Sequence, residues 1–98
     1  MIVVTGSITG RPDSIDALVA HSLEHVRRSR SEPGCLAHAV HRDVEDPLRL
    51  VFVEEWTDRA ALAAHFAVPA SGAFVKAVSA LAAAPPSIQI YEATPAKV

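Results

Sequence analysis

The chain has 98 residues, half of them apolar and a fifth charged, which is typical of one folded domain and excludes a disordered chain. Its formal net charge is −2, and no basic stripe is present, so nucleic acid is not an expected partner. The single cysteine, Cys35, allows neither an intrachain disulfide nor a cysteine zinc cluster. The apolar stretches are too short to span a bilayer and the start does not resemble a signal peptide, so we expect a cytoplasmic protein without a membrane partner.

Hydrophobic periodicity and turn residues predict the secondary structure. In chain order, the expected elements are a strand over 2–8, a helix over 15–29, strands over 35–43 and 49–56, a helix broken at 69–72 into 60–66 and 73–83, and a strand over 87–93. Asp13 or Ser14 supplies the N-cap of the first helix, and Pro85 ends the second. This order predicts an α+β, ferredoxin-like βαββαβ fold with an antiparallel sheet.

The third predicted strand carries apolar side chains on both of its faces. Its even-numbered face holds Leu50, Phe52, Glu54 and Trp56, and its odd-numbered face holds Val51, Val53 and Glu55. Because helices would cover only one face of the sheet, we expect a homodimer in which two sheets pair face to face as an α+β barrel. Small and β-branched side chains suit packing under helices, so the even-numbered face is expected to look into the barrel.

An ordered series of short motifs runs along most of the chain. It comprises Glu32-Pro33-Gly34-Cys35-Leu36, Asp46-Pro47, Glu54-Glu55-Trp56, Ala61-Leu62-Ala63-Ala64-His65 and Phe74. The series resembles the antibiotic biosynthesis monooxygenase domain family over roughly residues 2–92, which makes 1–98 a single domain of that kind. The resemblance implies a dimeric α+β barrel. It also implies oxidation of a quinol or polycyclic phenol by molecular oxygen without flavin, haem or metal, although many members have no established activity.

His65 is the residue that we predict to be catalytic. It follows the Trp56 strand on a helix and matches the helix histidine of the family, where it would take a phenolic proton or donate a hydrogen bond. The alternative is a histidine that packs the helix against the segment before Pro69. Trp56 is expected to bind the substrate, although a tryptophan in a small domain is more often part of the core.

Four further residues are predicted to bind the substrate. Phe52 and Phe74 would form an aromatic wall for a flat ligand, or else belong to the core. Glu54 lies on an apolar face and needs a partner. In the expected hairpin register that partner is His38, directly across, or Arg42. The alternative for this group is a structural hydrogen bond at the rim of the barrel.

The first helix carries two histidines and three arginines whose positions need an interpretation. His21 and His25 are four residues apart, a spacing that can hold zinc, but the sequence shows no third ligand. We therefore expect both to be solvated or partly packed, and we predict no metal site. The arginines 27, 28 and 30 are expected to be a solvated helix end that offsets the helix dipole.

The predicted function is a cofactor-independent monooxygenase that acts on a quinol or polyphenol. The alternative is a non-catalytic protein that binds a small aromatic in the same barrel, and a third possibility is an isomerase or lyase on this fold. Haem-degrading relatives need a ligating histidine near Val78, and none is present there, which counts against haem. A base facing a cavity that excludes water would favour the enzyme over the binding protein.

Overall fold

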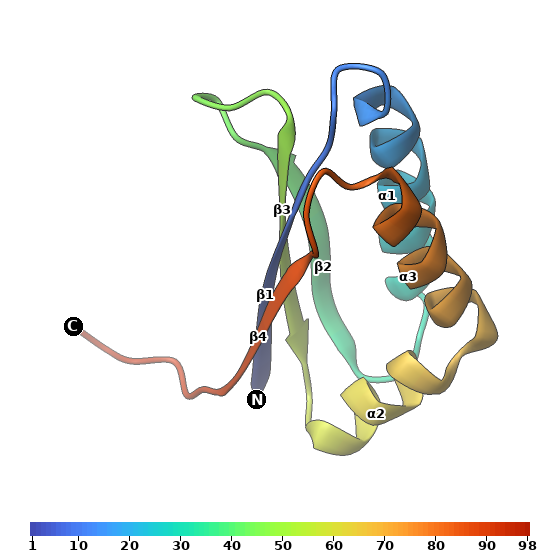
Figure 1. Cartoon of the computed structure of the whole chain (residues 1–98). Helices are drawn as coiled ribbons and strands as arrows, with labels where there is room; N and C mark the ends of the chain where they lie inside the picture. The colour runs from blue at the N-terminus through green and yellow to red at the C-terminus, as the bar shows by residue number, and fades with distance from the viewer.

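Seven elements make up the fold in the computed structural model, which describes every residue from 1 to 98. In chain order they are β1 (Ile2–Thr9), α1 (Ile15–Ser29), β2 (Cys35–Arg42), β3 (Arg49–Trp56), α2 (Arg59–Ala67), α3 (Pro69–Leu81) and β4 (Ser87–Glu92). The predicted ferredoxin-like order is confirmed, with the second helical unit divided into α2 and α3. The chain beyond β4 runs away from the body of the molecule (Figure 1).

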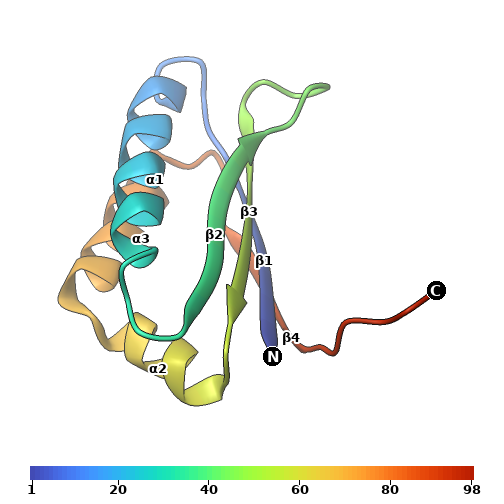
Figure 2. The ribbon, with the colours of Figure 1, turned by 180° about the vertical axis from the view of Figure 1, so that it is seen from behind.

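The four strands form one antiparallel sheet in the order β2-β3-β1-β4. The helices α1 and α3 lie side by side over one face of this sheet, and α2 lies below them near the end of β3 (Figure 1). Seen from behind, the opposite face has no helix over it (Figure 2). The sheet therefore has one covered face and one bare face.

The register of the β2–β3 hairpin decides which side chains share a face. His38 lies opposite Glu54, as the even-with-even pairing predicted. A β-bulge between Cys35 and Ala37 then shifts the pairing, so that Cys35 lies opposite Trp56. Leu36, which would share the even-numbered face with His38 if the strand were regular, lies at the bulge and is 56% exposed.

The expectation that the even-numbered face looks into a barrel is wrong, because this face lies under the helices. Leu50 and Phe52 pack in one core cluster with helix residues such as Leu18, Val26 and Val78. A second cluster, at the α2 end, contains Ile2, Val4, Trp56 and Leu62. The apolar stripes of the helices exclude most water when they meet large side chains, so the larger residues of β3 are on the covered face. Val51 and Val53 of β3 are on the bare face, whereas the β-branched residues Ile2, Val4 and Ile8 of β1 are buried under the helices.

The start of α1 is tied to the end of α3 by one serine. Ser14 is the N-cap of α1, and its hydroxyl donates to the Leu81 carbonyl at 2.8 Å while accepting from the Arg11 amide at 2.9 Å. Ser14 is buried and Leu81 is half-buried. The N-cap of α1 thus fixes where α3 ends and holds the two helices in register over the sheet.

The break between α2 and α3 is shorter than predicted. Only Val68 separates the helices, and α3 begins at Pro69 rather than at residue 73. Proline is tolerated in the first helical turn because the amide it lacks would have no partner there, so it starts α3 instead of interrupting it.

No single helix is long and apolar enough to cross a membrane, and α2 with α3 meets that test only as a pair bent by 70°.

Candidate functional site

A cavity of about 260 Å³ lies between α3 and the covered face of the sheet. His25 and Glu54 contribute polar groups to its lining, and Phe52, Phe74 and Val78 contribute to its apolar wall. Its volume is slightly below the range of about 300–1,000 Å³ that is usual for small-molecule pockets. Two depressions of about 610 and 520 Å³ lie near β1 and α2, but no histidine lines either of them. The cavity under α3 therefore combines aromatic walls with titratable groups.

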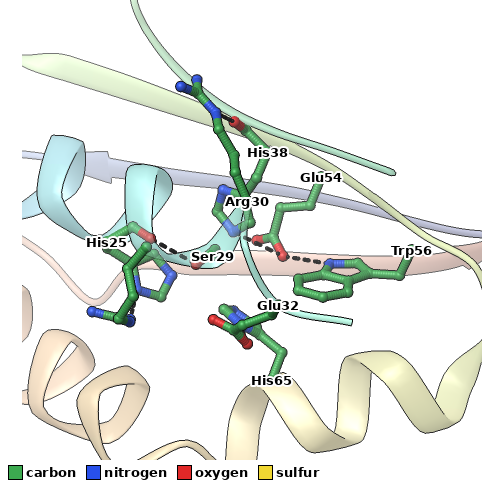
Figure 3. Close-up of polar contacts among 9 residues, drawn as sticks. His25, Ser29, Arg30, Glu32, His38, Glu54, Trp56 and His65 are labelled. Carbon is green, nitrogen blue, oxygen red and sulfur yellow. Dashed lines mark hydrogen bonds and ion pairs between the residues drawn. The ribbon is translucent and has the colours of Figure 1, made fainter. Parts of the chain in front are cut away.

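Three histidines from three different elements meet beside this cavity, and we call them the histidine triad. They are His25 of α1, His38 of β2 and His65 of α2, and all three are buried. Their ring centroids are 5.2 to 5.5 Å apart. One ring nitrogen from each lies within 4.8 Å of the others. Figure 3 shows the three rings arranged around one point, with a carboxylate beside two of them.

Glu54 connects the histidine triad to the cavity. Its Oε1 accepts a hydrogen bond from Trp56 Nε1 at 2.9 Å and lies 3.3 Å from His38 Nε2 (Figure 3). Burial would raise the pKa of the Glu54 carboxyl, but the His38 contact and the Trp56 N–H outweigh burial, so that this pKa is lowered. The carboxylate is therefore held in its ionised form, and of the two predicted partners, His38 and Arg42, it is His38 that contacts it.

The second carboxylate beside the histidine triad belongs to Glu32. Its Oε1 lies 2.9 Å from His65 Nδ1, and both side chains are largely buried. Glu32 reaches this place because the chain turns sharply after α1, where Gly34 adopts a φ of 81° that favours glycine. Since a carboxylate accepts hydrogen bonds, it holds the proton of His65 on Nδ1. Nε2 is then the unprotonated nitrogen, on the side of the other two histidines.

His25 is the member of the histidine triad that lines the cavity. Its ring stacks on Phe74 with the centroids 3.9 Å apart, and its Nδ1 lies 2.7 Å from a guanidinium nitrogen of Arg28. The pKa of His25 is lowered to about 3, first by burial and then by the neighbouring His38, His65 and Arg28. His25 is therefore neutral at physiological pH, and its Nδ1 accepts from Arg28.

The backbone around the histidine triad is fixed by two side chains at the end of α1. Ser29 donates its hydroxyl hydrogen to the His25 carbonyl, four residues earlier in the helix, at 2.6 Å. Arg30 donates from Nε to the His38 carbonyl at 2.9 Å and so joins α1 to β2 (Figure 3). The arginines near this helix end were predicted to be only a solvated group, but Arg28 and Arg30 both contact triad residues.

The structure places the six predicted site residues in two groups. Phe52, Glu54 and Phe74 line the cavity. His38, His65 and Trp56 lie behind it, with the His65 ring 4.7 Å from the Trp56 ring. Trp56 has no exposed surface, which gives it a structural role as well as any role in binding. The substrate contacts of all six remain predictions.

Sequence reasoning missed His25 and Glu32. His25 was paired with His21, which is exposed and takes no part in the cluster. A usable signal was present, because His25 falls within the buried stripe of α1, beside Ser22, Val26 and Ser29. Glu32 had no comparable signal, since its contact with His65 joins residues 33 positions apart.

Comparison with known proteins gives consistent results. Residues 1–77 match the family model described as antibiotic biosynthesis monooxygenase. The uncharacterised protein sll1783 of Synechocystis is 38% identical over 91 residues, and the match covers 93% of this chain but only 62% of that protein. A crystal structure of an antibiotic biosynthesis monooxygenase is 34% identical with a TM-score of 0.89, covering 97% of this chain and 100% of its own. Rv0793 from Mycobacterium tuberculosis shares the fold, with a TM-score of 0.90 at 23% identity, over 99% of this chain and 98% of its own. The chain therefore belongs to the antibiotic biosynthesis monooxygenase family.

Proposed function

We propose that this protein is a monooxygenase that oxidises a quinol or a related polyphenol with molecular oxygen. The observation that carries the proposal is the cavity under α3, in which two aromatic side chains and a neutral histidine face the same space. Phe52 and Phe74 provide surfaces on which a flat ring stacks. Membership of the family agrees with this chemistry.

The proposed reaction needs no external reductant. Ground-state oxygen reacts slowly with closed-shell molecules, whereas an ionised quinol gives up electrons readily. A quinol with a free ring position supplies all four electrons: one oxygen atom enters the ring, the other leaves as water, and the product is a hydroxylated quinone. The protein then has two tasks, which are to remove a phenolic proton and to keep the anion away from water.

We assign the final proton acceptor to His65. His25 is nearer to the substrate, but with a pKa of about 3 it would take a proton from a phenol only at a cost of roughly 10 kcal/mol. His65 has the Glu32 carboxylate on its Nδ1, which orients the ring and fixes its tautomer, so that Nε2 is left to accept a proton. In this proposal Arg28 turns away from His25, whose Nδ1 then accepts the phenolic proton while its Nε2 releases a proton toward His65, so that the His25 ring never holds a charge.

We also propose that the protein is a homodimer that pairs through the bare face of the sheet. This face carries Val51 and Val53, and Val53 is 38% exposed. At the edges of the sheet, Leu36 and Tyr91 are 56% and 47% exposed. Burying these side chains against a second copy would stabilise the dimer by about 25 cal/mol per Å² of apolar surface.

Oxygen uptake by metal-free protein tests the proposal. Wild-type protein is mixed with a panel of quinols and anthrone-like phenols, and the rate is compared with the autoxidation blank. We expect uptake above the blank that is lost in His65→Ala and retained in His41→Ala, which changes an exposed histidine. Equal rates in the two variants would remove His65 from the mechanism.

One observation favours a second function, the binding of an aromatic without catalysis. His65 does not line the cavity, and the histidine that does is a weak base. A protein that only binds would show saturable binding of a phenol with no oxygen uptake by any compound of the panel. That pair of results would replace the oxygenase with a binding protein.

A further inference from the structure

We propose that the histidine triad is a binding site for one divalent transition-metal ion of the Zn²⁺ class. His25, His38 and His65 would each give one nitrogen, and the fourth position would face the cavity. This inference goes beyond the oxygenase proposal and does not rest on it. A metal ion and a proton compete for the same nitrogens, so a bound metal would inhibit the reaction proposed above.

The spacing of the three rings fits a metal ion. In a tetrahedral site with Zn–N distances of about 2.0–2.1 Å, the centroids of two imidazole ligands lie roughly 5.2 Å apart. The observed centroid distances are 5.2, 5.3 and 5.5 Å. The ligand nitrogens, which lie within 4.8 Å of one another, would have to approach to roughly 3.3 Å. Rotation of the rings about their own bonds achieves this while their centres stay nearly in place.

His38 supplies an independent argument. Its side chain has no exposed surface, and neither of its ring nitrogens makes a hydrogen bond. The contact of Nε2 with Glu54 at 3.3 Å is close enough for an ion pair but lacks hydrogen-bond geometry. A buried polar group without a hydrogen bond costs about 1–3 kcal/mol and is rare in folded proteins. A metal ion on His38 would satisfy it.

The surroundings of the histidine triad resemble the outer shell of a metal site. Histidine ligands of metal ions usually donate their second N–H to a carboxylate, which fixes the ring and increases its basicity. Glu32 is placed in this way on His65, and Glu54 lies beside His38. The two carboxylates also offset the charge of a divalent ion. Neutral imidazoles suit Zn²⁺, Co²⁺, Ni²⁺ and Cu²⁺ better than Mg²⁺ or Ca²⁺.

Arg28 opposes metal binding. Its guanidinium donates to His25 Nδ1 at 2.7 Å, which places the proton of His25 on Nε2 and adds a positive charge next to the site. Arg28 is only part-buried, so it can turn away when a metal binds. The geometry therefore predicts that Arg28→Met, which keeps the apolar stem and removes the charge, binds the metal more tightly than the wild-type protein.

The test uses Co²⁺ as a spectroscopic probe and Zn²⁺ as a competitor, with untagged, chelator-treated protein and no substrate. We expect one Co²⁺ per chain, a visible absorption band typical of tetrahedral coordination, and loss of that band when Zn²⁺ is added. His38→Gln and His65→Gln should abolish the band. His21→Gln and His41→Gln, which change exposed histidines, should leave it unchanged.

Two further variants separate a metal site from a loss of folding. Glu32→Gln keeps all three ligands and should raise the Kd for Zn²⁺ about 10–100-fold. Arg28→Met should lower it, a gain of binding that damage to the fold cannot produce. No Co²⁺ band in the wild-type protein, or a band that disappears in His21→Gln instead of His38→Gln, would overturn the inference. Because no substrate is present, either result leaves the oxygenase proposal untouched.

Discussion

Two substitutions of Trp56 separate the stability that comes from packing of its ring from the stability that comes from the hydrogen bond of its N–H. Trp56 has no exposed surface and packs with Ile2, Val4 and Leu62, so Trp56→Ala removes a large part of that cluster. Substitutions of this kind cost about 3–5 kcal/mol. Trp56→Phe keeps an aromatic ring but removes the N–H that donates to Glu54 at 2.9 Å. Losing a hydrogen bond to a charged group costs about 1.5–3 kcal/mol.

The free energies of unfolding are measured by urea denaturation, with circular dichroism as the signal, because Trp56 is the only tryptophan of the chain. Protein concentration is held constant, since a dimer would add to the apparent stability. We expect Trp56→Ala to be the least stable protein and Trp56→Phe to be intermediate. In a Glu54→Gln background the cost of Trp56→Phe should fall, because the charged acceptor is gone. A cost below about 1 kcal/mol for Trp56→Ala would refute the assignment of this residue to the core.

Three other changes test particular contacts of the fold. Gly34→Ala should cost about 1–3 kcal/mol of unfolding free energy, because its φ is 81° and a Cβ there would lie 2.5 Å from the Cβ of Ala61; wild-type stability in a thermal melt would disprove the close contact. Ser14→Ala should cost about 1 kcal/mol through loss of its bond to the Leu81 carbonyl, whereas Ser31→Ala, which changes a serine with an exposed hydrogen bond, should be nearly neutral in the same melt. Val53→Asp should convert the proposed dimer to a folded monomer in analytical ultracentrifugation, and a variant that still sediments as a dimer would show that the bare face is not the interface.

Local sequence signals were sufficient for most of the fold. The β-branched run at the start, the N-cap at Ser14 and the hairpin around residues 43–48 each predict an element that the structure contains. Which face of the sheet meets the helices could not be predicted in this way. A strand that is apolar on both faces can turn either face toward its own helices or toward another subunit. Phe52 and Trp56 looked like residues of a ligand-binding barrel, yet their size is what fills the space under the helices.

The site was predicted in part, and what was missed has a common cause. His38 and Glu54 could be placed together because the register of a hairpin follows from its short turn. His25 and Glu32 lie next to their partners only after α1 packs on the sheet and the chain turns at Gly34. The spacing of residues along one helix drew attention to His21 and His25, whereas the actual partners of His25 come from β2 and α2. Contacts between distant segments leave no pattern in a single sequence.

The most direct test of the function is the ionisation state of a phenol bound in the cavity. A phenol that oxidises slowly is added under argon to metal-free protein at neutral pH, and its ultraviolet spectrum distinguishes phenol from phenolate. We predict the phenolate spectrum with the wild-type protein and the spectrum of the neutral phenol with His65→Gln. A neutral phenol bound equally well to both proteins would contradict the claim that this cavity takes a proton from an aromatic substrate.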